Sequence, residues 1–105
     1  MTLSTHVLDA TTGRPAVGVA VTLTAAGTPV ADGATDTDGR IGDLGGELAA
    51  GIYRLHFDTG AYFAAEGVKG FYPEVVITFE ITDVPGHYHV PLLLSPYSYS
   101  TYRGS

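Results

Sequence analysis

Several residue types that would commit the chain to a particular chemistry are missing or scarce. The 105 residues include no cysteine and no tryptophan, so disulfides, thiolate nucleophiles and thiolate metal ligands are excluded. Lysine and arginine together number 5, against 11 aspartates and glutamates, and the formal net charge is −6. Such a chain lacks the basic face that nucleic-acid phosphates and anionic membranes require. We therefore expect neither nucleic acid nor a membrane as a partner.

Long apolar runs and a secretory leader are also lacking. The apolar runs extend over a few residues, whereas about 20 are needed to cross a bilayer. The opening residues 1–6 show neither a basic stretch nor an apolar stretch, so we expect a soluble, cytoplasmic protein. Hydrophobic residues make up 45% of the chain and charged residues 15%, which excludes disorder by charge excess. The length predicts a single domain over residues 1–105, with a modest core that favours association between chains.

What the sequence does contain is short alternating runs of β-forming residues, separated by 14 glycines and 6 prolines. This pattern is typical of a β-sandwich or barrel. In the clearest run, residues 51–58, Tyr53, Leu55 and Phe57 share one face. In another, residues 17–26, the alternation predicts that Val17 shares one face with Val19, Val21, Leu23 and Ala25. The other predicted strands are residues 3–8, 17–26, 29–35, 74–82, 86–95 and 98–102.

One stretch has helical character and several have turn chemistry. Residues 59–66 contain alanine pairs and stop before Gly67, a suitable helix C-cap. Residues 9–15 and 36–39 are predicted turns, the first using Gly13 at positive φ. Pro91 falls inside a strand pattern and predicts an edge position or a bulge, since it cannot donate to a ladder. The chain is therefore predicted to be all-β, with seven or eight strands and one short helix.

Four histidines are the main candidates for chemistry. On one strand, His87 and His89 must lie on the same face, about 7 Å apart. That spacing suits a shared zinc ion, a shared water molecule, or an ordinary solvated face, and no third metal ligand is evident. His6 should face away from its neighbours, on the side of Ser4 and Leu8. His56 is predicted to be structural or solvent-facing, on the outer face of its strand.

Arg40 and the end of the chain complete the candidates. Arg40 follows a predicted turn, and its guanidinium fork matches a planar ring rich in carbonyl groups. The last eleven residues are rich in tyrosine, which predicts a docked tail whose hydroxyls find partners. Apolar residues of the preceding strand, Leu92 and Leu94, are expected to face another subunit.

Particular segments resemble one known family. HYHVPLLLSPY at residues 87–97 and the terminal YRGS at 102–105 resemble the 5-hydroxyisourate hydrolases, the transthyretin-related enzymes of urate breakdown. HVLD at 6–9, GRPA at 13–16 and TDGR at 37–40 also match. The resemblance extends over the whole chain, and its most discriminating part is YRGS, which separates the hydrolases from transthyretin, the hormone carrier.

The resemblance implies a transthyretin-like, two-sheet sandwich that assembles as a homotetramer, with sites in channels between paired subunits. It assigns His6, Arg40 and His89 to the active site, with Tyr102 and Ser105 binding the substrate. The implied reaction is hydrolysis of 5-hydroxyisourate to 5-hydroxy-2-oxo-4-ureido-2,5-dihydroimidazole-5-carboxylate, with no cofactor and no metal. Physically, His6 or His89 would take a proton from water while Arg40 stabilises developing negative charge.

Two other functions remain open at this point. The chain could be a transthyretin-like carrier of small aromatic ligands, although a carrier needs no group that transfers protons. Alternatively, His87 and His89, with His6, could hold zinc; in the hydrolase we expect added zinc to inhibit by competing with water for the imidazoles.

Overall fold

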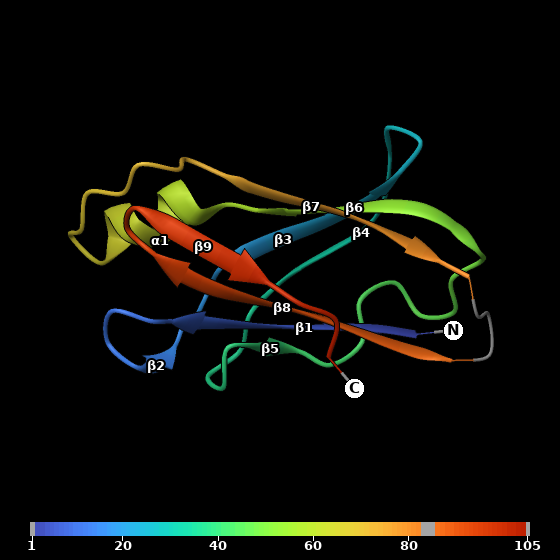
Figure 1. Cartoon of the computed structure of the whole chain (residues 1–105), viewed down its shortest axis with the longest axis horizontal. Helices are drawn as coiled ribbons and strands as arrows, with labels where there is room; N and C mark the ends of the chain where they lie inside the picture. The colour runs from blue at the N-terminus through green and yellow to red at the C-terminus, as the bar shows by residue number, and fades with distance from the viewer. Residues whose placement is uncertain (1, 83–85, 105) are drawn as a thin grey trace.

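Two β-sheets and one helix make up the part of the chain that the computed structural model describes, residues 2–82 and 86–104. The first sheet has the order β2–β1–β8–β9, with β5 also paired to β1, and the second has the order β4–β3–β6–β7 (Figure 1). The first contains β1 (Thr2–Asp9), β2 (Arg14–Pro15), β5 (Arg40–Ile41), β8 (His87–Ser95) and β9 (Ser98–Thr101). The second contains β3 (Ala20–Ala25), β4 (Thr28–Ala34), β6 (Gly51–Phe57) and β7 (Val75–Ile81), and α1 (Thr59–Ala65) follows β6.

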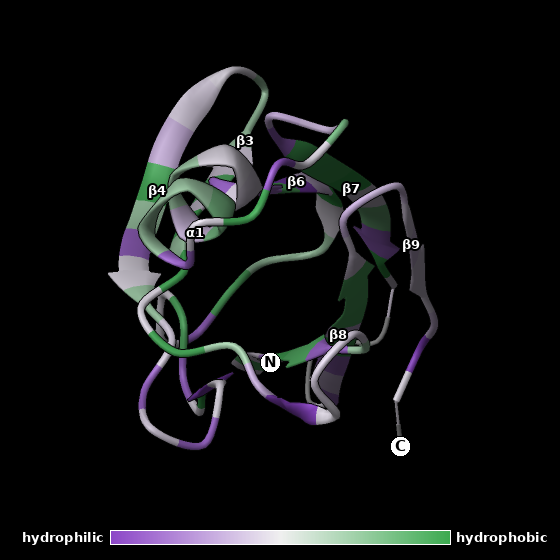
Figure 2. Cartoon of the chain, turned by 90° about the vertical axis from the view of Figure 1, so that its left-hand side faces the viewer, coloured by the Kyte–Doolittle hydropathy of each residue, from purple (hydrophilic) through white to green (hydrophobic). Residues whose placement is uncertain are grey.

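The sheets enclose a core built from alternate residues of their strands. In β6, Tyr53, Leu55 and Phe57 are buried as predicted, and in β1 the inward positions include Leu3 and Val7. Figure 2 looks along the sandwich and shows the strands surrounding this shared interior, with α1 at one end. The predicted all-β sandwich with one short helix is confirmed. Within the described residues, no helix is long and apolar enough to cross a membrane.

The first strand and the penultimate strand lie side by side and run parallel. Their register pairs eight positions, from Thr2 opposite His87 to Asp9 opposite Leu94. The buried Thr5 hydroxyl reinforces the pairing by donating to the Val90 carbonyl at 2.7 Å. Residues more than eighty positions apart in the sequence are therefore neighbours across one ladder.

Two predictions about side-chain direction are wrong. Val17 lies before β3 and is 52% exposed, because Gly18 adopts φ +78° and turns the chain before the strand begins. Leu92 and Leu94 are fully buried in the sandwich, so they do not face another subunit. They share the inward side of β8 with Tyr88 and Val90, whereas the half-buried Leu93 points the other way.

Two short strands raise the count above the seven or eight predicted. β2 and β5 contain two residues each, and both pair with β1 on the side opposite β8. Runs this short carry no alternation that sequence reasoning could detect.

Pro91 marks a break in the pairing between β8 and the tail. The β8–β9 ladder runs from Ser95 opposite Ser98 to Leu92 opposite Thr101, and the same register resumes with a single bridge between His89 and Gly104. Val90 and Pro91 lie between these two pairs. Pro91 has no N–H to donate, although its carbonyl accepts from the Thr101 hydroxyl at 2.7 Å. β8 is a central strand with no register shift at Pro91, which pairs with His6, so the predicted edge position or bulge is wrong. Pro91 is nevertheless not fully paired, because the β8–β9 ladder ends at Leu92.

The tail is docked, but its tyrosines are not what holds it. Tyr97, Tyr99 and Tyr102 are all exposed, so the prediction that their hydroxyls pin the tail is wrong for the described residues. Main-chain pairing with β8 provides the attachment instead. The ring of Tyr99 makes an edge contact with Tyr72, with centroids 5.1 Å apart.

The predicted turn at residues 36–39 places β5 against β1. The Gly39 N–H donates to the Asp36 carbonyl at 2.9 Å, and the Gly39 carbonyl accepts from the Val7 N–H at 2.8 Å. Gly39 adopts φ +72°, and a Cβ there would lie 2.6 Å from the Val7 oxygen. Gly39 thus combines a left-handed backbone with close contact to β1, and both exclude a side chain.

This close approach predicts an unequal pair of glycine substitutions. Gly13 also has φ +72°, but nothing lies within 4 Å of a Cβ built on it. We expect Gly13→Ala to lower the free energy of unfolding by about 1 kcal/mol, and Gly39→Ala by roughly 3 kcal/mol because steric overlap adds to backbone strain. Urea unfolding of the two variants checks this. Equal losses would show that the approach of Gly39 to β1 imposes no constraint.

Candidate functional site

Polar side chains from three strands gather on the outer face of the first sheet. Because side chains alternate along a strand, the burial of Leu3, Thr5 and Val7 directs Ser4 and His6 of β1 outward. In the same way, the burial of Tyr88 and Val90 directs His87 and His89 of β8 outward. These four side chains therefore occupy one surface.

Arg40 joins this surface through the pairing of β5 with β1. Arg40 lies directly opposite His6 in the antiparallel register, so the two side chains project from the same face about 5 Å apart at their Cα atoms. His89 lies on the other side of β1, opposite Ser4, which places its Cα roughly 8 Å diagonally from that of His6. The structure thus brings His6, Arg40 and His89 together.

The turn before β5 fixes the backbone of Arg40. The Asp36 Oδ1 atom accepts from the N–H of Asp38 at 2.9 Å and from the N–H of Arg40 at 3.0 Å. The Asp36 N–H donates back to the Arg40 carbonyl at 3.0 Å. The bond from the Arg40 N–H, followed by that from Asp38, lowers the pKa of the Asp36 carboxyl. An ionised Asp36 therefore anchors the residue that carries the guanidinium.

Ser4 lies between the two histidines of β8. Its Oγ is 2.8 Å from Nε2 of His87 and 2.7 Å from Nδ1 of His89. The other nitrogen of His87, Nδ1, is 2.6 Å from the hydroxyl of Thr2. Ser4 is 9% exposed. The prediction that His87 and His89 share a face is confirmed, and a hydroxyl joins them.

His89 lies in an environment that disfavours its charged form. Burial, and then the positive charge of Arg40, lower the pKa of His89, with smaller effects from His6 and His87. The tail packs directly on it, since the Gly104 N–H donates to the His89 carbonyl at 2.8 Å. A Cβ at Gly104 would collide with the His89 ring.

Two tail residues, Tyr102 and Ser105, were also predicted to bind the substrate. Tyr102 is exposed, and Ser105 lies outside the described residues. The Arg103 guanidinium lies over the ring of Tyr88, 4.4 Å from its centroid, in a cation–π contact. Arg103 thereby holds the end of the chain against β8.

The described residues contain no three-ligand zinc site, and His56 lies outside the candidate site. Among residues 2–82 and 86–104, no group of three or more histidine, aspartate or glutamate side chains is arranged to hold a metal ion. His56 lies on the second sheet, where its Nε2 is 3.3 Å from Oε1 of Glu74. His56 therefore lies on the other sheet from the candidate site, and its side chain is 41% exposed.

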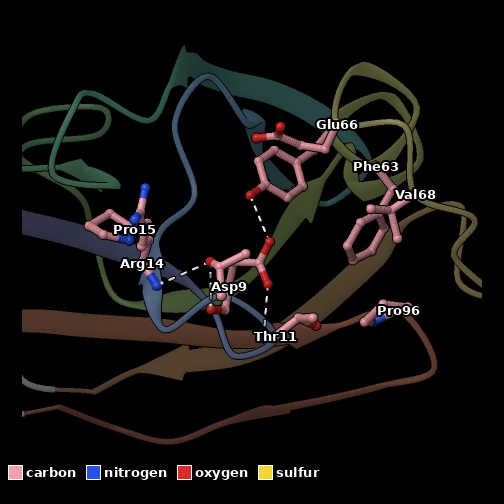
Figure 3. A pocket seen from close by; sticks show the side chains of 10 residues that line it. Asp9, Thr11, Arg14, Pro15, Phe63, Glu66, Val68 and Pro96 are labelled. Atoms are coloured by element: carbon pink, nitrogen blue, oxygen red, sulfur yellow. Dashed lines mark hydrogen bonds between the residues drawn. The ribbon is translucent and has the colours of Figure 1, made fainter.

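A separate cavity of about 270 Å³ lies where the end of β1 meets α1 (Figure 3). At its wall, the hydroxyl of Tyr62 donates to Oδ2 of Asp9 at 2.9 Å, while Oδ1 accepts from the Thr11 N–H at 3.0 Å. Burial and the Asp9 carboxylate raise the pKa of Tyr62, which keeps the phenol protonated as a donor. None of the predicted catalytic residues lines this cavity, and its hydrogen bonds join β1 to the helix.

Sequence reasoning missed Ser4 and Asp36 as residues that organise the site. Ser4 was recognised as sharing the face of His6, but its role depends on the register that places it opposite His89. Asp36 was read as part of a turn, and an aspartate four positions before an arginine was the signal that its side chain could bond the following backbone.

Comparisons with known proteins show which family the chain is similar to. The model of the HIUase/Transthyretin family matches residues 3–104. A 5-hydroxyisourate hydrolase of Salmonella dublin is 50% identical over 109 residues, which cover 98% of this chain and 80% of that protein. The structure of Klebsiella pneumoniae 5-hydroxyisourate hydrolase has a TM-score of 0.93 at 43% identity, covering 100% of both chains. A transthyretin of Sparus aurata has a TM-score of 0.90 at 40% identity, covering 97% of this chain and 95% of that one. The chain belongs to the HIUase/Transthyretin family.

Proposed function

We propose that this chain is a 5-hydroxyisourate hydrolase, which opens the six-membered ring of 5-hydroxyisourate in urate degradation. The observation that carries the proposal is the meeting of two imidazoles and a guanidinium, His6, His89 and Arg40, on one face of the first sheet. Relatives that match nearly the whole chain bear the name of this enzyme. A carrier of apolar ligands has no need for a cluster of groups that exchange protons.

The reaction requires a nucleophilic water and a place for negative charge. Water attacks a ring carbonyl carbon, and one imidazole, of His6 or His89, takes its proton. The C–N bond of the ring then breaks, the leaving nitrogen receives a proton, and the attacked carbon becomes a carboxylate. A lowered pKa suits His89 for proton uptake, because its neutral form persists to lower pH than an ordinary histidine.

Arg40 supplies the electrostatic part of the mechanism. A guanidinium donates two parallel hydrogen bonds to neighbouring oxygens, so it orients a ring rich in carbonyls and stabilises charge that develops on the attacked carbonyl. Tyr102 and Ser105 orient the ring from the tail. Together with the imidazoles, Arg40 gives the site a locally positive potential within a chain of net charge −6.

The site is completed by assembly into a homotetramer, in which channels between paired subunits enclose the outer face of the first sheet. The half-buried outward residues Leu8 and Leu93 are the kind of apolar surface that a subunit interface covers. Enclosure also excludes bulk water, which strengthens the electrostatic interactions in the site.

Single substitutions in the cluster should abolish turnover without unfolding the chain. We expect His6→Ala, Arg40→Ala and His89→Ala each to lower kcat/KM by roughly 100-fold or more, since each removes a proton-transfer group or charge stabilisation. The measurement follows the absorbance decay of 5-hydroxyisourate freshly generated by urate oxidase, and circular dichroism verifies folding. His56→Ala, on the other sheet, is the matched control and should retain activity.

This assay also separates the hydrolase from a carrier. Decay of 5-hydroxyisourate no faster with the wild-type protein than without it would end the enzyme proposal. Tight, saturable binding of an iodophenol without turnover would favour the carrier instead.

The charge of Arg40 should be visible in the titration of His89. We expect Arg40→Gln to raise the pKa of His89 towards the ordinary value of about 6.5, because loss of a nearby positive charge makes the imidazolium less costly. Nuclear magnetic resonance of the ring protons checks this, with Arg54→Gln on the opposite sheet as control. An unchanged His89 titration in Arg40→Gln would show that the two groups do not interact.

The assembly has its own test. Four chains of 11.0 kDa make a particle of about 44 kDa, and light scattering at micromolar concentration should report that mass. A species of the single-chain mass would contradict a site formed between subunits.

A further inference from the structure

We propose that Ser4 and His87 form a proton relay for His89, which makes His89 the base of the reaction and His87 the group that holds its proton until the leaving nitrogen is protonated. This inference rests on the proposed function and adds to it two residues that the catalytic cluster does not include. It follows from an unbroken row of side-chain hydrogen bonds along the outer face of β1 and β8.

The row contains four side chains and three short hydrogen bonds. Thr2 Oγ1 is 2.6 Å from His87 Nδ1, His87 Nε2 is 2.8 Å from Ser4 Oγ, and Ser4 Oγ is 2.7 Å from His89 Nδ1. All three distances are within hydrogen-bonding range. Both nitrogens of His87 are engaged in the row, whereas His89 contributes only Nδ1. Nε2 of His89 is therefore the nitrogen available to water.

The single proton of the Ser4 hydroxyl couples the two rings. A hydroxyl that lies between two ring nitrogens donates to one and accepts from the other. When Nδ1–H of His89 donates to Ser4, the Ser4 O–H must donate to Nε2 of His87, and Nδ1–H of His87 then donates to Thr2. This arrangement leaves Nε2 of His89 with a free lone pair, which is the tautomer a base requires.

Proton uptake then moves one proton along the row. Water gives its proton to Nε2 of His89 as its oxygen attacks the ring carbon. The Nδ1–H bond of His89 breaks as a new O–H bond forms on Ser4, and the original Ser4 O–H bond breaks as an N–H bond forms on Nε2 of His87. His89 returns to neutral and now carries its proton on Nε2, while His87 becomes the imidazolium.

Burial and charge favour this direction of transfer. His89 is half-buried beside Arg40 and His6, and the tail packs on its ring. His87 lies opposite Thr2, two positions farther than His89 from His6 and Arg40 along the ladder, so a positive charge there is repelled less. Among the described residues, the charged and titratable groups acting on His89 are Arg40, His6 and His87.

The transfer also prepares the second half of the reaction. After it, Nε2 of His89 carries a proton that the leaving ring nitrogen needs when the C–N bond breaks. As His89 donates that proton, the proton held by His87 returns through the Ser4 hydroxyl to Nδ1 of His89, so both rings end neutral in their starting tautomers. The proton of the new carboxyl group goes to solvent. The relay therefore lets one histidine act first as base and then as acid without an imidazolium remaining beside Arg40.

The first experiment alters the hydroxyl. Ser4→Ala should lower kcat by roughly 10- to 100-fold with KM changed less than about threefold, because proton transfer and not substrate binding is impaired. Ser4→Thr keeps the hydroxyl and should restore most of the rate. Thr22→Ala, a hydroxyl in β3 of the other sheet opposite His56, is the matched control and should behave as wild type.

The second measurement reads the tautomers without turnover. In protein labelled with ¹⁵N-histidine, at a pH where both rings are neutral, His87 and His89 should each carry hydrogen on Nδ1. Ser4→Ala should release His89 from that state. If His89 of the wild-type protein carries its hydrogen on Nε2, or if Ser4→Ala leaves the tautomer unchanged, the relay is wrong.

A third variant tests His87 as the proton acceptor and remains informative if Ser4→Ala does not fold. His87→Ala removes an exposed ring and should lower kcat about tenfold. Added imidazole should restore that loss in a concentration-dependent manner, whereas the wild-type rate should not depend on buffer concentration. Full activity in His87→Ala, or a loss that imidazole does not restore, would overturn the relay.

These outcomes are distinguishable from failure of the proposed function. Absence of turnover in the wild-type protein would refute the hydrolase and the relay together. An active wild type whose His6→Ala and Arg40→Ala variants are inactive, but whose Ser4 and His87 variants retain full rate, would leave the hydrolase intact and refute the relay alone.

Discussion

The parallel pairing of β1 with β8 is the constraint on which the rest of the structure depends. Leu3 and Val7 on one strand, and Val90 and Leu92 on the other, are sealed in the sandwich. Because side chains alternate with a period of two, a slip of one residue would expose these apolar groups and turn the polar ones inward. Burial of the core therefore also sets which side chains face outward. Stability and site geometry have the same origin.

The electrostatics of the site follow from this placement. Cationic and titratable groups from β1, β5 and β8 share one surface in a chain that is acidic overall. The carboxylate of Asp36 accepts hydrogen bonds from backbone N–H groups of its own turn, and its charge also interacts with that of Arg40. Burial, and then the positive charge of Arg40, lower the pKa of the nearby imidazole of His89.

Much of the fold could be predicted from alternation and turn chemistry, since Tyr53, Leu55 and Phe57 report their shared face locally. Val17 was misassigned because Gly18 turns the chain before the strand begins. Leu92 and Leu94 were misassigned because a sequence shows which residues share a face but not whether that face meets the core or a partner. His6, Arg40 and His89 were identified through the resemblance, whereas the position of Ser4 between two histidines depends on strand register, which no single segment encodes.

The wide separation in sequence between β1 and β8 has a consequence for biosynthesis. β1 leaves the ribosome first, yet its long ladder partner is made only when nearly all of the chain has been translated. Until then its apolar face has no β8 to pack beside, and the closure of so large a loop slows folding. The nascent chain therefore carries an unfinished first sheet for most of its synthesis. The residues of the site come together only in a late folding step, when β8 pairs with β1.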